Sequence, residues 1–383
     1  MQPNVGRHRA GLFKPDNVYV DIKVSNTTGA DNMLMRYSQQ RSAPIVDNPS
    51  DYYLSLVRWK VPGGSFPILV FQVEESQLNP NRGVYTVTLE TSTDIVQRSL
   101  YFYPSTSVAQ QQIPSNVGDV QKQTEYYFVY EFQHFVDMVN SALFSAFDNV
   151  VGKPVGAEAP FLIFDVTTGL FGLIAQTANY SVQVDSTPAS NPTDPPTYDA
   201  DIKIYFNNEL YNLFRGLASK AFSTLDQGRD YQILVANYGN NYWPNQNSPV
   251  LYPSDYLVVW QQYSSTTQWI AVNQILFSTS LIPIQPEYTG TSNNSYKKIL
   301  TDFEPLSNSN VRDVRQTLQY YPSGPYRLID LTGTTPLYGI DLIVTWIDIN
   351  GHEYNATIPP NEQFSAKLLF VRRDLYTPSE LMK

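Results

Sequence analysis

The stretch that decides the fold is IDLIVTWIDINGH, from Ile340 to His352. Apolar and β-branched residues dominate it as far as Ile349, which is typical of a strand. The run then meets Asn350-Gly351, the dipeptide that most favours a tight β-hairpin turn. The stretch therefore predicts a strand of an antiparallel sheet that turns back on itself.

Further runs of the same kind lie on both sides of this stretch, separated by clusters of turn residues. Toward the N-terminus, strands are predicted at Val18–Val24, Asp51–Val61, Ile68–Val73 and Val84–Glu90. In the C-terminal part, they are predicted at Tyr256–Gln261, Trp269–Ile284, Val314–Tyr321, Tyr326–Leu331 and Lys367–Arg372. Eight or more strands divided between the two ends of a chain suggest a sandwich that both ends complete.

The middle of the chain has a different pattern. Apolar residues from Tyr130 to Phe147 recur at three- and four-residue spacing, which predicts an amphipathic helix. A hairpin with a glycine-bearing turn is expected over Phe161–Gln176, then a strand over Asp201–Phe206 and a short capped helix over Asn207–Phe214. This change of pattern predicts an α+β domain inserted between two all-β stretches.

The fold class predicted from these patterns is mainly β, an antiparallel jelly-roll β-sandwich with a large α+β insertion domain. The predicted domains are a basic N-terminal arm (1–16), a first part of the sandwich (17–110), the insertion (111–245), a second part of the sandwich (246–375) and a C-terminal tail (376–383).

Composition limits the class of function. The 383 residues include 28 Tyr and 27 Pro but only 16% charged residues, against about 25% in an average protein. So many Tyr residues suit polar-edged interfaces between proteins. There is no Cys, so disulfides and thiolate metal sites are excluded. The net charge of −10 argues against nucleic acid as the principal partner. No uncharged run of about 18 residues is apolar enough to form a membrane span.

The first fourteen residues differ from the rest of the chain, because they contain basic residues and no acid. The basic residues are Arg7, His8, Arg9 and Lys14. One interpretation is a short basic arm that contacts nucleic acid or an acidic neighbour. The other is a solvated terminus without a partner.

Residue types that carry chemistry do not form a recognisable site. The three histidines, His8, His134 and His352, lack the spacing of a zinc site, and a spatial triad built on one of them stays open but disfavoured. Gly63-Gly64 lacks the Lys and the helix of a phosphate-binding loop. No catalytic, cofactor-binding or metal-binding residue is predicted, and no cofactor is expected.

Two weaker chemical patterns concern calcium binding and sugar hydrolysis. The segment Asp348–Glu353 has some residue types of a calcium loop but lacks its twelve-residue length, so a solvated hairpin is the preferred interpretation. Carboxylates are frequent enough to line a sugar cleft, but the sequence gives no separation between any two of them. A hydrolase therefore ranks third among the functions considered.

A set of short motifs, spread from Asp51 to Arg373, resembles a known family. In the N-terminal half and the middle they are Asp51–Leu54, Pro62-Gly63, Ile204–Asn207, Leu210 and Leu213-Phe214. In the C-terminal half they are Trp269, Gln274–Ser280, Pro283, Glu287, Ile299–Phe303, Tyr321-Pro322, Tyr326–Leu331, Leu337, Ile340-Asp341, Trp346, Gly351 and Lys367–Arg373. The chain resembles the penton (minor capsid) proteins of polinton-like viruses and virophages.

The resemblance implies a structural virion protein and not an enzyme. It implies a jelly-roll subunit that forms homopentamers at the icosahedral vertices and contacts the major capsid protein, after assembly inside the host cell. A host receptor or a glycan is a further candidate partner. The alternative function is a carbohydrate- or receptor-binding β-sandwich protein, which fits the acidic charge and the many Tyr residues equally well.

Overall fold

The computed structural model describes residues 15–29, 33–74, 79–105, 114, 124–181, 200–222, 228–235, 255–269, 271–288, 296–305, 317–320 and 327–375. The chain divides into two compact units. Unit 1 consists of Met1–Phe66, Val272–Pro305 and Val314–Lys383, and unit 2 consists of Pro67–Ala271 with Leu306–Asp313. Unit 2 is therefore inserted into the sequence of unit 1.

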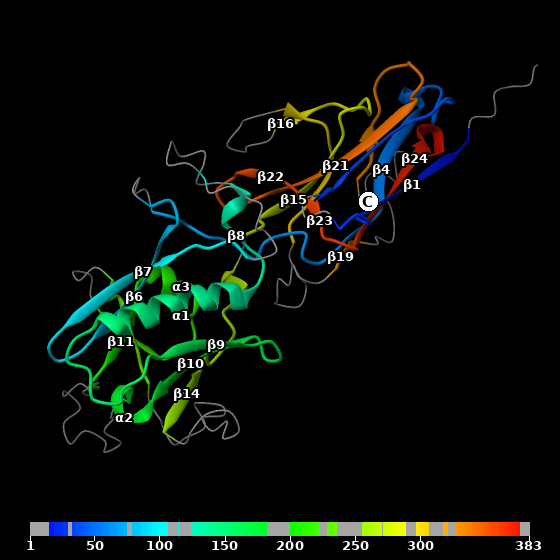
Figure 1. Ribbon diagram of the computed structural model, residues 1–383. Helices are drawn as coiled ribbons and strands as arrows, with labels where there is room; N and C mark the ends of the chain where they lie inside the picture. The colour runs from blue at the N-terminus through cyan, green and yellow to red at the C-terminus, as the bar shows by residue number, and fades with distance from the viewer. Residues whose placement is uncertain are drawn as a thin grey trace, which may run out of the picture. The chain divides into compact units, whose positions relative to one another are not determined.

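The described part of unit 1 consists of strands and two 3-10 helices (Figure 1). Its strands are β1 (Asn17–Ser25), β2 (Met33–Leu34), β3 (Arg36–Gln40), β4 (Tyr52–Val61), β15 (Gln274–Ser278), β16 (Glu287–Tyr288), β17 (Tyr296–Lys297), β18 (Ile299–Phe303), β19 (Leu318–Tyr320), β20 (Ile329–Asp330), β21 (Gly339–Ile347), β22 (Glu353–Asn355), β23 (Thr357–Ile358) and β24 (Gln363–Arg372). The 3-10 helices are η1 (Pro49–Asp51) and η6 (Arg373–Leu375).

Unit 2 mixes helices with strands. Its strands are β5 (Leu69–Val70), β6 (Arg82–Glu90), β7 (Ile95–Tyr101), β8 (Phe128–Val129), β9 (Phe161–Asp165), β10 (Leu170–Gln176), β11 (Lys203–Phe206), β12 (Ser219–Ala221), β13 (Tyr231–Ile233) and β14 (Tyr256–Trp260). Its helices are α1 (Phe132–Asn149), α2 (Thr177–Tyr180), α3 (Asn208–Leu213) and the 3-10 helices η4 (Glu125–Tyr127) and η5 (Thr266–Gln268).

The strand order of unit 1 is that of a jelly roll. One sheet has the order β1-β24-β4-β19, with β20 also paired to β4, and the other has the order β18-β15-β21 with β3 and β22 paired to β21. In chain order the eight main strands are β1, β3, β4, β15, β18, β19, β21 and β24. The first therefore pairs with the eighth, the second with the seventh, the third with the sixth and the fourth with the fifth, all antiparallel. Such a chain is one long hairpin rolled into two sheets.

Aromatic side chains hold the two sheets of unit 1 together. Trp59 of β4 lies 5.3 Å from Phe277 of β15 and 4.9 Å from Phe303 of β18, measured between ring centroids. Phe364 of β24 stacks on Phe277 at 6.5 Å. Each such pair contributes about 0.5–1.5 kcal/mol beyond the burial of its apolar area. The inner faces of the two sheets therefore form one core.

The Asn-Gly turn joins β21 to β22 as the sequence predicts. The N–H of Gly351 donates to the carbonyl of Asp348 over 3.2 Å, and the N–H of Asp348 donates to the carbonyl of His352 over 2.9 Å. Gly351 has φ 81°, a left-handed conformation that costs glycine least. The turn returns the chain along β21, which is the central strand of its sheet.

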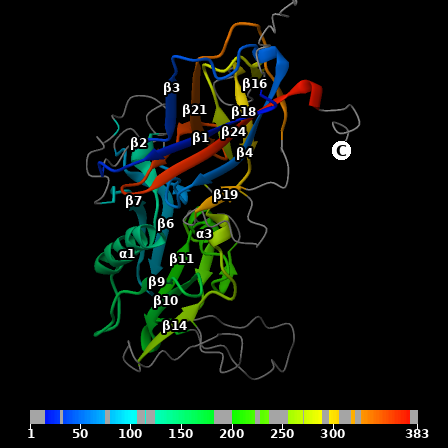
Figure 2. The same ribbon diagram turned by 90° about the vertical axis from the view of Figure 1, so that its right-hand side faces the viewer.

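Unit 2 packs helix α1 against two sheets, with the orders β12-β13-β11-β6-β7 and β14-β10-β9. Figures 1 and 2 both show α1 beside the β6–β7 hairpin, and α1 also contacts β9. Phe135 lies 5.3 Å from Tyr85 of β6 and 5.0 Å from Trp269, while Phe132 lies 4.7 Å from Phe164 of β9. The apolar stripe predicted from the sequence is thus the core of this unit.

The predicted mainly β fold, the jelly roll, helix α1 and the β9–β10 hairpin are confirmed. The predicted domain boundaries differ from the division of the structure, because the insertion occupies 67–271 instead of 111–245. Strands β6 and β14 exist where they were expected, but they pair with β7, β11 and β10 inside unit 2. Alternation of apolar and polar residues identifies a strand with one buried face, but it does not identify the neighbouring strand.

The predicted arm is only partly described, and the predicted tail is not described at all. Residues 1–14 of the arm and 376–383 of the tail lie outside the described residues. Pro15 and Asp16 are described, and their carbonyls accept hydrogen bonds from the Tyr52 hydroxyl (3.1 Å) and from the N–H of Arg372 (3.0 Å). The chain is therefore attached to the sandwich from Pro15 onward.

Val139 of α1 provides a test of the core of unit 2. Its side chain is fully buried, so Val139→Asp places a charge without a partner among apolar groups and should lower the free energy of unfolding by more than about 3 kcal/mol. Phe144→Asp on the same helix is the matched control, because Phe144 is 64% exposed. Thermal unfolding followed by circular dichroism measures both; equal melting temperatures for the two variants would contradict this core.

Candidate functional site

Each histidine that the structure describes has a hydrogen-bond or ion-pair partner within the protein. His134 lies on α1, where its Nε2 donates to the carbonyl of Tyr103 over 2.7 Å. His352 lies in the β21–β22 hairpin, where its Nδ1 is 3.1 Å from a carboxylate oxygen of Asp348. The two belong to different units, and His8 lies outside the described residues. Each of the two described histidines is therefore engaged in a contact within its own unit.

The segment Asp348–Glu353 forms a hairpin turn. One carboxylate oxygen of Asp348 accepts the N–H groups of Asn350 and His352, each over 2.8 Å, and the other accepts the hydroxyl of Tyr354 over 3.3 Å. Burial, and then the charge of Asp348, raises the pKa of Tyr354. The oxygens that a calcium ion would need are thus engaged with the turn itself. Among the described residues, no group of three or more His, Asp or Glu side chains is placed to hold a metal ion.

Asp341 is a buried carboxylate that fixes the loop after β15. Its oxygens accept the hydroxyls of Thr279 and Ser280 and the N–H groups of Ser280 (2.8 Å) and Leu281 (2.9 Å). Burial alone raises the pKa of Asp341, but these four donors outweigh burial and leave the pKa below its usual value. A carboxylate so fully engaged stabilises a loop and is not available as a general base.

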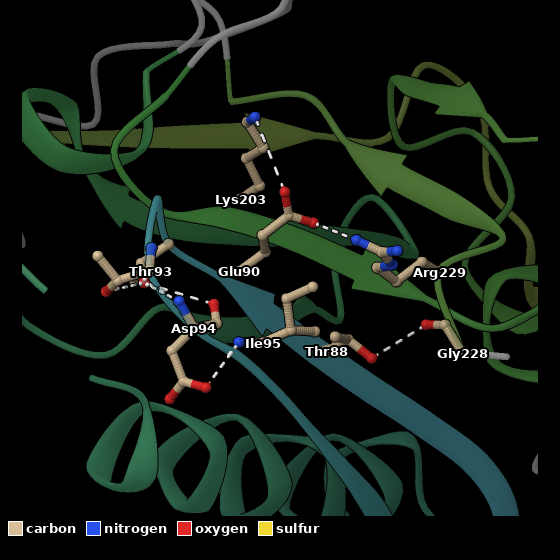
Figure 3. A network of polar contacts seen from close by, with 9 residues as sticks. Thr88, Glu90, Thr93, Asp94, Ile95, Lys203, Gly228 and Arg229 are labelled. Atoms are coloured by element: carbon tan, nitrogen blue, oxygen red, sulfur yellow. Dashed lines mark hydrogen bonds and ion pairs between the residues drawn. The ribbon is translucent and has the colours of Figure 1, made fainter. Parts of the chain in front are cut away.

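Glu90, at the end of β6, is the centre of a polar network in unit 2. Figure 3 shows its carboxylate between Arg229, at 2.8 Å, and Lys203 of β11, at 4.0 Å. Nearby, the hydroxyl of Thr88 donates to the carbonyl of Gly228 over 3.0 Å. The network ties the β6–β7 hairpin to β11 and to the chain at residues 228–229. One carboxylate thus holds two cations from separate segments, which fits a structural role.

Charge is divided unequally between the two units. Unit 2 contains 20 acidic and 9 basic residues, a net charge of −11, so the remaining charge on unit 1 is +1. The acidity of the whole chain is thus a property of unit 2. Although unit 1 is nearly neutral as a whole, it carries a local patch of positive charge.

A basic face covers the outer side of the β1-β24-β4 sheet. Four basic side chains point to this side, namely Lys23, Lys60, Lys367 and Arg58. Paired residues of neighbouring strands point to the same side of a sheet, and Lys23 pairs with Ser365, which pairs with Lys60. In the same way, Asp21 pairs with Lys367, which pairs with Arg58. Asp21 is the one acid among them and lies 3.1 Å from Arg58 and 3.3 Å from Lys367. The five side chains carry a net charge of +3. We call this surface the basic face.

The outer side of the other sheet of unit 1 contains a hollow of about 430 Å³. Leu276 of β15, Ile299 of β18 and Ile347 of β21 form one apolar cluster at its base. Leu276 points outward because it alternates with Ile275 and Phe277, which pair with core positions of β21. The remaining lining residues are Asn273, Gln274, Glu287, Tyr288, Asp302, Asp348, Ile349 and Gly351. We call this feature the β15 hollow.

Neither surface was identified from the sequence. Arg7, His8, Arg9 and Lys14 of the predicted contact arm are outside the described residues. The basic face had a signal in the sequence, since Lys residues recur at outward positions of strands expected near both ends of the chain. The β15 hollow had none, because its residues come from four separate segments.

These observations define a class. Unit 1 is a single jelly roll, and its described histidine and the buried Asp341 and Asp348 serve local structural contacts. Viral capsid proteins are one class that uses this fold. Among the described residues, no helix has the length and hydrophobicity needed to cross a membrane.

Comparison with known proteins assigns the family. The family model described as Sputnik minor capsid protein V18/19 matches residues 18–372, so the chain belongs to this family. Structural protein V19 of the Sputnik virophage is 31% identical over 219 residues, which cover 55% of this chain and 94% of that protein. The uncharacterised protein V18 of the same virophage is 33% identical over 156 residues, 39% of this chain and 92% of that protein.

Solved structures agree with this assignment. A chain in the cryo-EM structure of the Sputnik virophage matches with a TM-score of 0.77 and 30% identity, over 94% of this chain and 99% of that one. The mavirus penton protein matches in fold, with a TM-score of 0.61 and 13% identity, over 94% of this chain and 100% of that one. The chain is a structural protein of the virion, as the sequence predicted, and the alternative of a carbohydrate- or receptor-binding protein is not favoured.

Asp341→Asn tests the role of the buried carboxylate. The amide keeps the shape but loses the charge that its four donors stabilise, so the free energy of unfolding should fall by about 3 kcal/mol at pH 7. Because the pKa of Asp341 is lowered in the folded state, the stabilisation is complete above the unfolded pKa of about 3.9 and is lost as the pH falls through the lower folded pKa. Unfolding in urea between pH 7 and pH 3 measures this difference. The exposed Asp47→Asn is the control, and a pH-independent difference between Asp341→Asn and the natural chain would contradict the argument.

Proposed function

We propose that the protein is the penton subunit of a virophage-like particle, five copies of which close each five-fold vertex and contact the major capsid protein. A closed icosahedral shell has vertices at which five copies of a subunit meet around an axis. Cyclic symmetry of this kind requires each copy to present two different surfaces, one to each neighbour.

The single jelly roll of unit 1 is the observation that carries this proposal. A minor capsid protein with one sandwich in each chain suits a vertex position that the major capsid protein does not fill. The fold of the mavirus penton protein, which covers nearly the whole chain, supports the same position. The outer faces of the two sheets differ, since one is the basic face and the other contains the β15 hollow, so the subunit can present unlike surfaces to unlike neighbours in a shell.

The basic face supports a contact with an acidic surface of the major capsid protein. Its net charge of +3 stands against −10 for the whole chain, so it attracts carboxylates where most of this protein repels them. Asp21 lies among the cations of this face and separates them, which suits discrete carboxylates better than a continuous polyanion. The proposed role is non-enzymatic, in keeping with the local contacts of Asp341, Asp348 and Glu90.

The oligomeric state tests the proposed pentamer. The purified chain should form a species of about five times 43.4 kDa, and averaged electron micrographs of it should show five-fold rings. Light scattering coupled to size-exclusion chromatography measures the mass. A chain that stays monomeric up to its solubility limit, or that forms rings of another order, would overturn the proposal.

Charge reversal tests the basic face. The double variant Arg58→Glu with Lys60→Glu should fold and form the same oligomer, because both side chains lie on the surface. Its incorporation into particles should fall at least about ten-fold, since like charges would then face each other across the contact. Arg41→Glu, at an exposed position of the same unit, is the control. Normal incorporation of the double variant in a co-expression assembly assay would exclude the basic face as the contact.

A further inference from the structure

Strand β1 is an open edge of the sandwich. It lies at the border of its sheet (Figure 1), and among the described residues β24 is the only strand that pairs with it. Its nine residues, Asn17–Ser25, pair with β24 without a bulge and include no Pro or Gly. Proteins commonly protect an edge strand by keeping it short or by placing a bulge or a Pro in it, because an unprotected edge accepts a further strand. β1 has none of these three protections.

The free backbone groups of β1 belong to alternate residues. In an antiparallel pair, every second residue directs its N–H and C=O at the partner strand. On β1 these are the even-numbered residues, because the carbonyl of Asp16 accepts the N–H of Arg372 over 3.0 Å and the N–H of Asn26 donates to the carbonyl of Glu362 over 3.0 Å. The odd-numbered residues therefore direct their N–H and C=O away from β24. Within the described residues these groups have no hydrogen-bond partner, and they belong to Asn17, Tyr19, Asp21, Lys23 and Ser25.

The apolar side of β1 is incompletely covered. Its core-facing residues Val18, Val20 and Val24 are only half-buried, whereas the residues opposite them on β24 are completely buried. A strand added beside β1 would cover these valines with apolar residues of its own. Because side chains alternate along a strand, its other residues would then lie on the outer side of the sheet, next to the basic face.

The basic face determines the charge that such a strand should carry. Asp21 is already engaged by Arg58 at 3.1 Å and Lys367 at 3.3 Å. Lys23 is exposed and has no ion-pair partner in the described part of the chain. Acidic residues on the outer side of the added strand would lie beside this cation, whereas basic ones would meet a net charge of +3. A second copy of β1 is disfavoured for the same reason, since edge pairing would place two basic faces side by side.

We propose that the free edge of β1 binds an extended segment of a partner protein as an additional β-strand, whose apolar residues face the core and whose acidic residues face outward. Backbone hydrogen bonds provide affinity in this mode of recognition, and the alternating side chains provide specificity. The inference goes beyond attraction between charged surfaces, and it holds for any number of copies at a vertex.

Binding of a synthetic strand tests the proposal. The probe is a fluorescein-labelled peptide of nine residues in which glutamate and valine alternate, and the matched control has lysine in place of each glutamate. Fluorescence anisotropy with the full chain should show at least about ten-fold tighter binding of the glutamate peptide. A lysine peptide that binds equally well would overturn the assigned charge of the partner. Absence of binding by both peptides would overturn the edge as a binding site.

Hydrogen exchange measured at single residues identifies the mode of binding. The N–H groups of Val20 and Ile22 are protected by β24 in the free chain, whereas those of Tyr19, Asp21 and Lys23 should exchange rapidly. The bound glutamate peptide should slow exchange at the odd-numbered residues at least about ten-fold. Slowing without this alternation would overturn strand addition. Alternating protection that rises with protein concentration in the absence of peptide would identify a second copy as the occupant and overturn the proposed partner.

A pair of variants at Tyr19 separates backbone pairing from charge. Tyr19→Pro and Tyr19→Thr both remove the ring and leave the charge of the basic face unchanged, but only the proline removes the N–H at the free edge. Both variants should keep similar melting temperatures, because this N–H is not bonded to β24. The proline variant should bind the glutamate peptide at least about five-fold more weakly than the threonine variant. Equal affinities, or a proline variant that does not fold, would contradict the proposed edge.

Discussion

The pairing of β24 with both β1 and β4 is the constraint on which unit 1 depends. β24 joins the beginning and the end of the chain over nine registered pairs with β1, and on its other side it pairs with eight positions of β4. This double pairing fixes which residues face the core and which face outward, because a shift by one residue would exchange the two sides. The basic face and the aromatic core are two consequences of the same register.

The insertion of unit 2 leaves this constraint untouched. It enters between β4 and β15, which are adjacent in the chain order of the jelly roll but lie in different sheets. A connection at that place can be lengthened without breaking a strand pair. Unit 2 has its own aromatic core around Phe135 and Trp269 and carries all of the net negative charge, so the two units differ in chemistry as well as in fold.

The sequence predicted the elements better than their partners. The Asn350-Gly351 turn, helix α1 and most strands follow from local patterns that depend on neighbouring residues only. The assignment of β6 and β14 to the sandwich was wrong, because their partners β11 and β10 are set by contacts between distant segments. The same holds for Trp269, which was placed in a sandwich strand and instead donates its indole N–H to the carbonyl of Leu213 in unit 2. The β15 hollow could not be predicted, since four segments create it together.

The register between β1 and β24 also sets the order in which the protein can be made. Asn17 pairs with Val371, more than 350 residues later, so at about 5–20 residues per second a ribosome needs roughly 20–70 s to supply the partner of the first strand. Unit 2 is a nearly contiguous segment and can complete its core during that time. The first strands of unit 1 must wait with their apolar sides and edges unpaired, which exposes them to aggregation. Synthesis in the infected cell therefore favours conditions that shield these strands, such as binding by chaperones, until the last strand emerges.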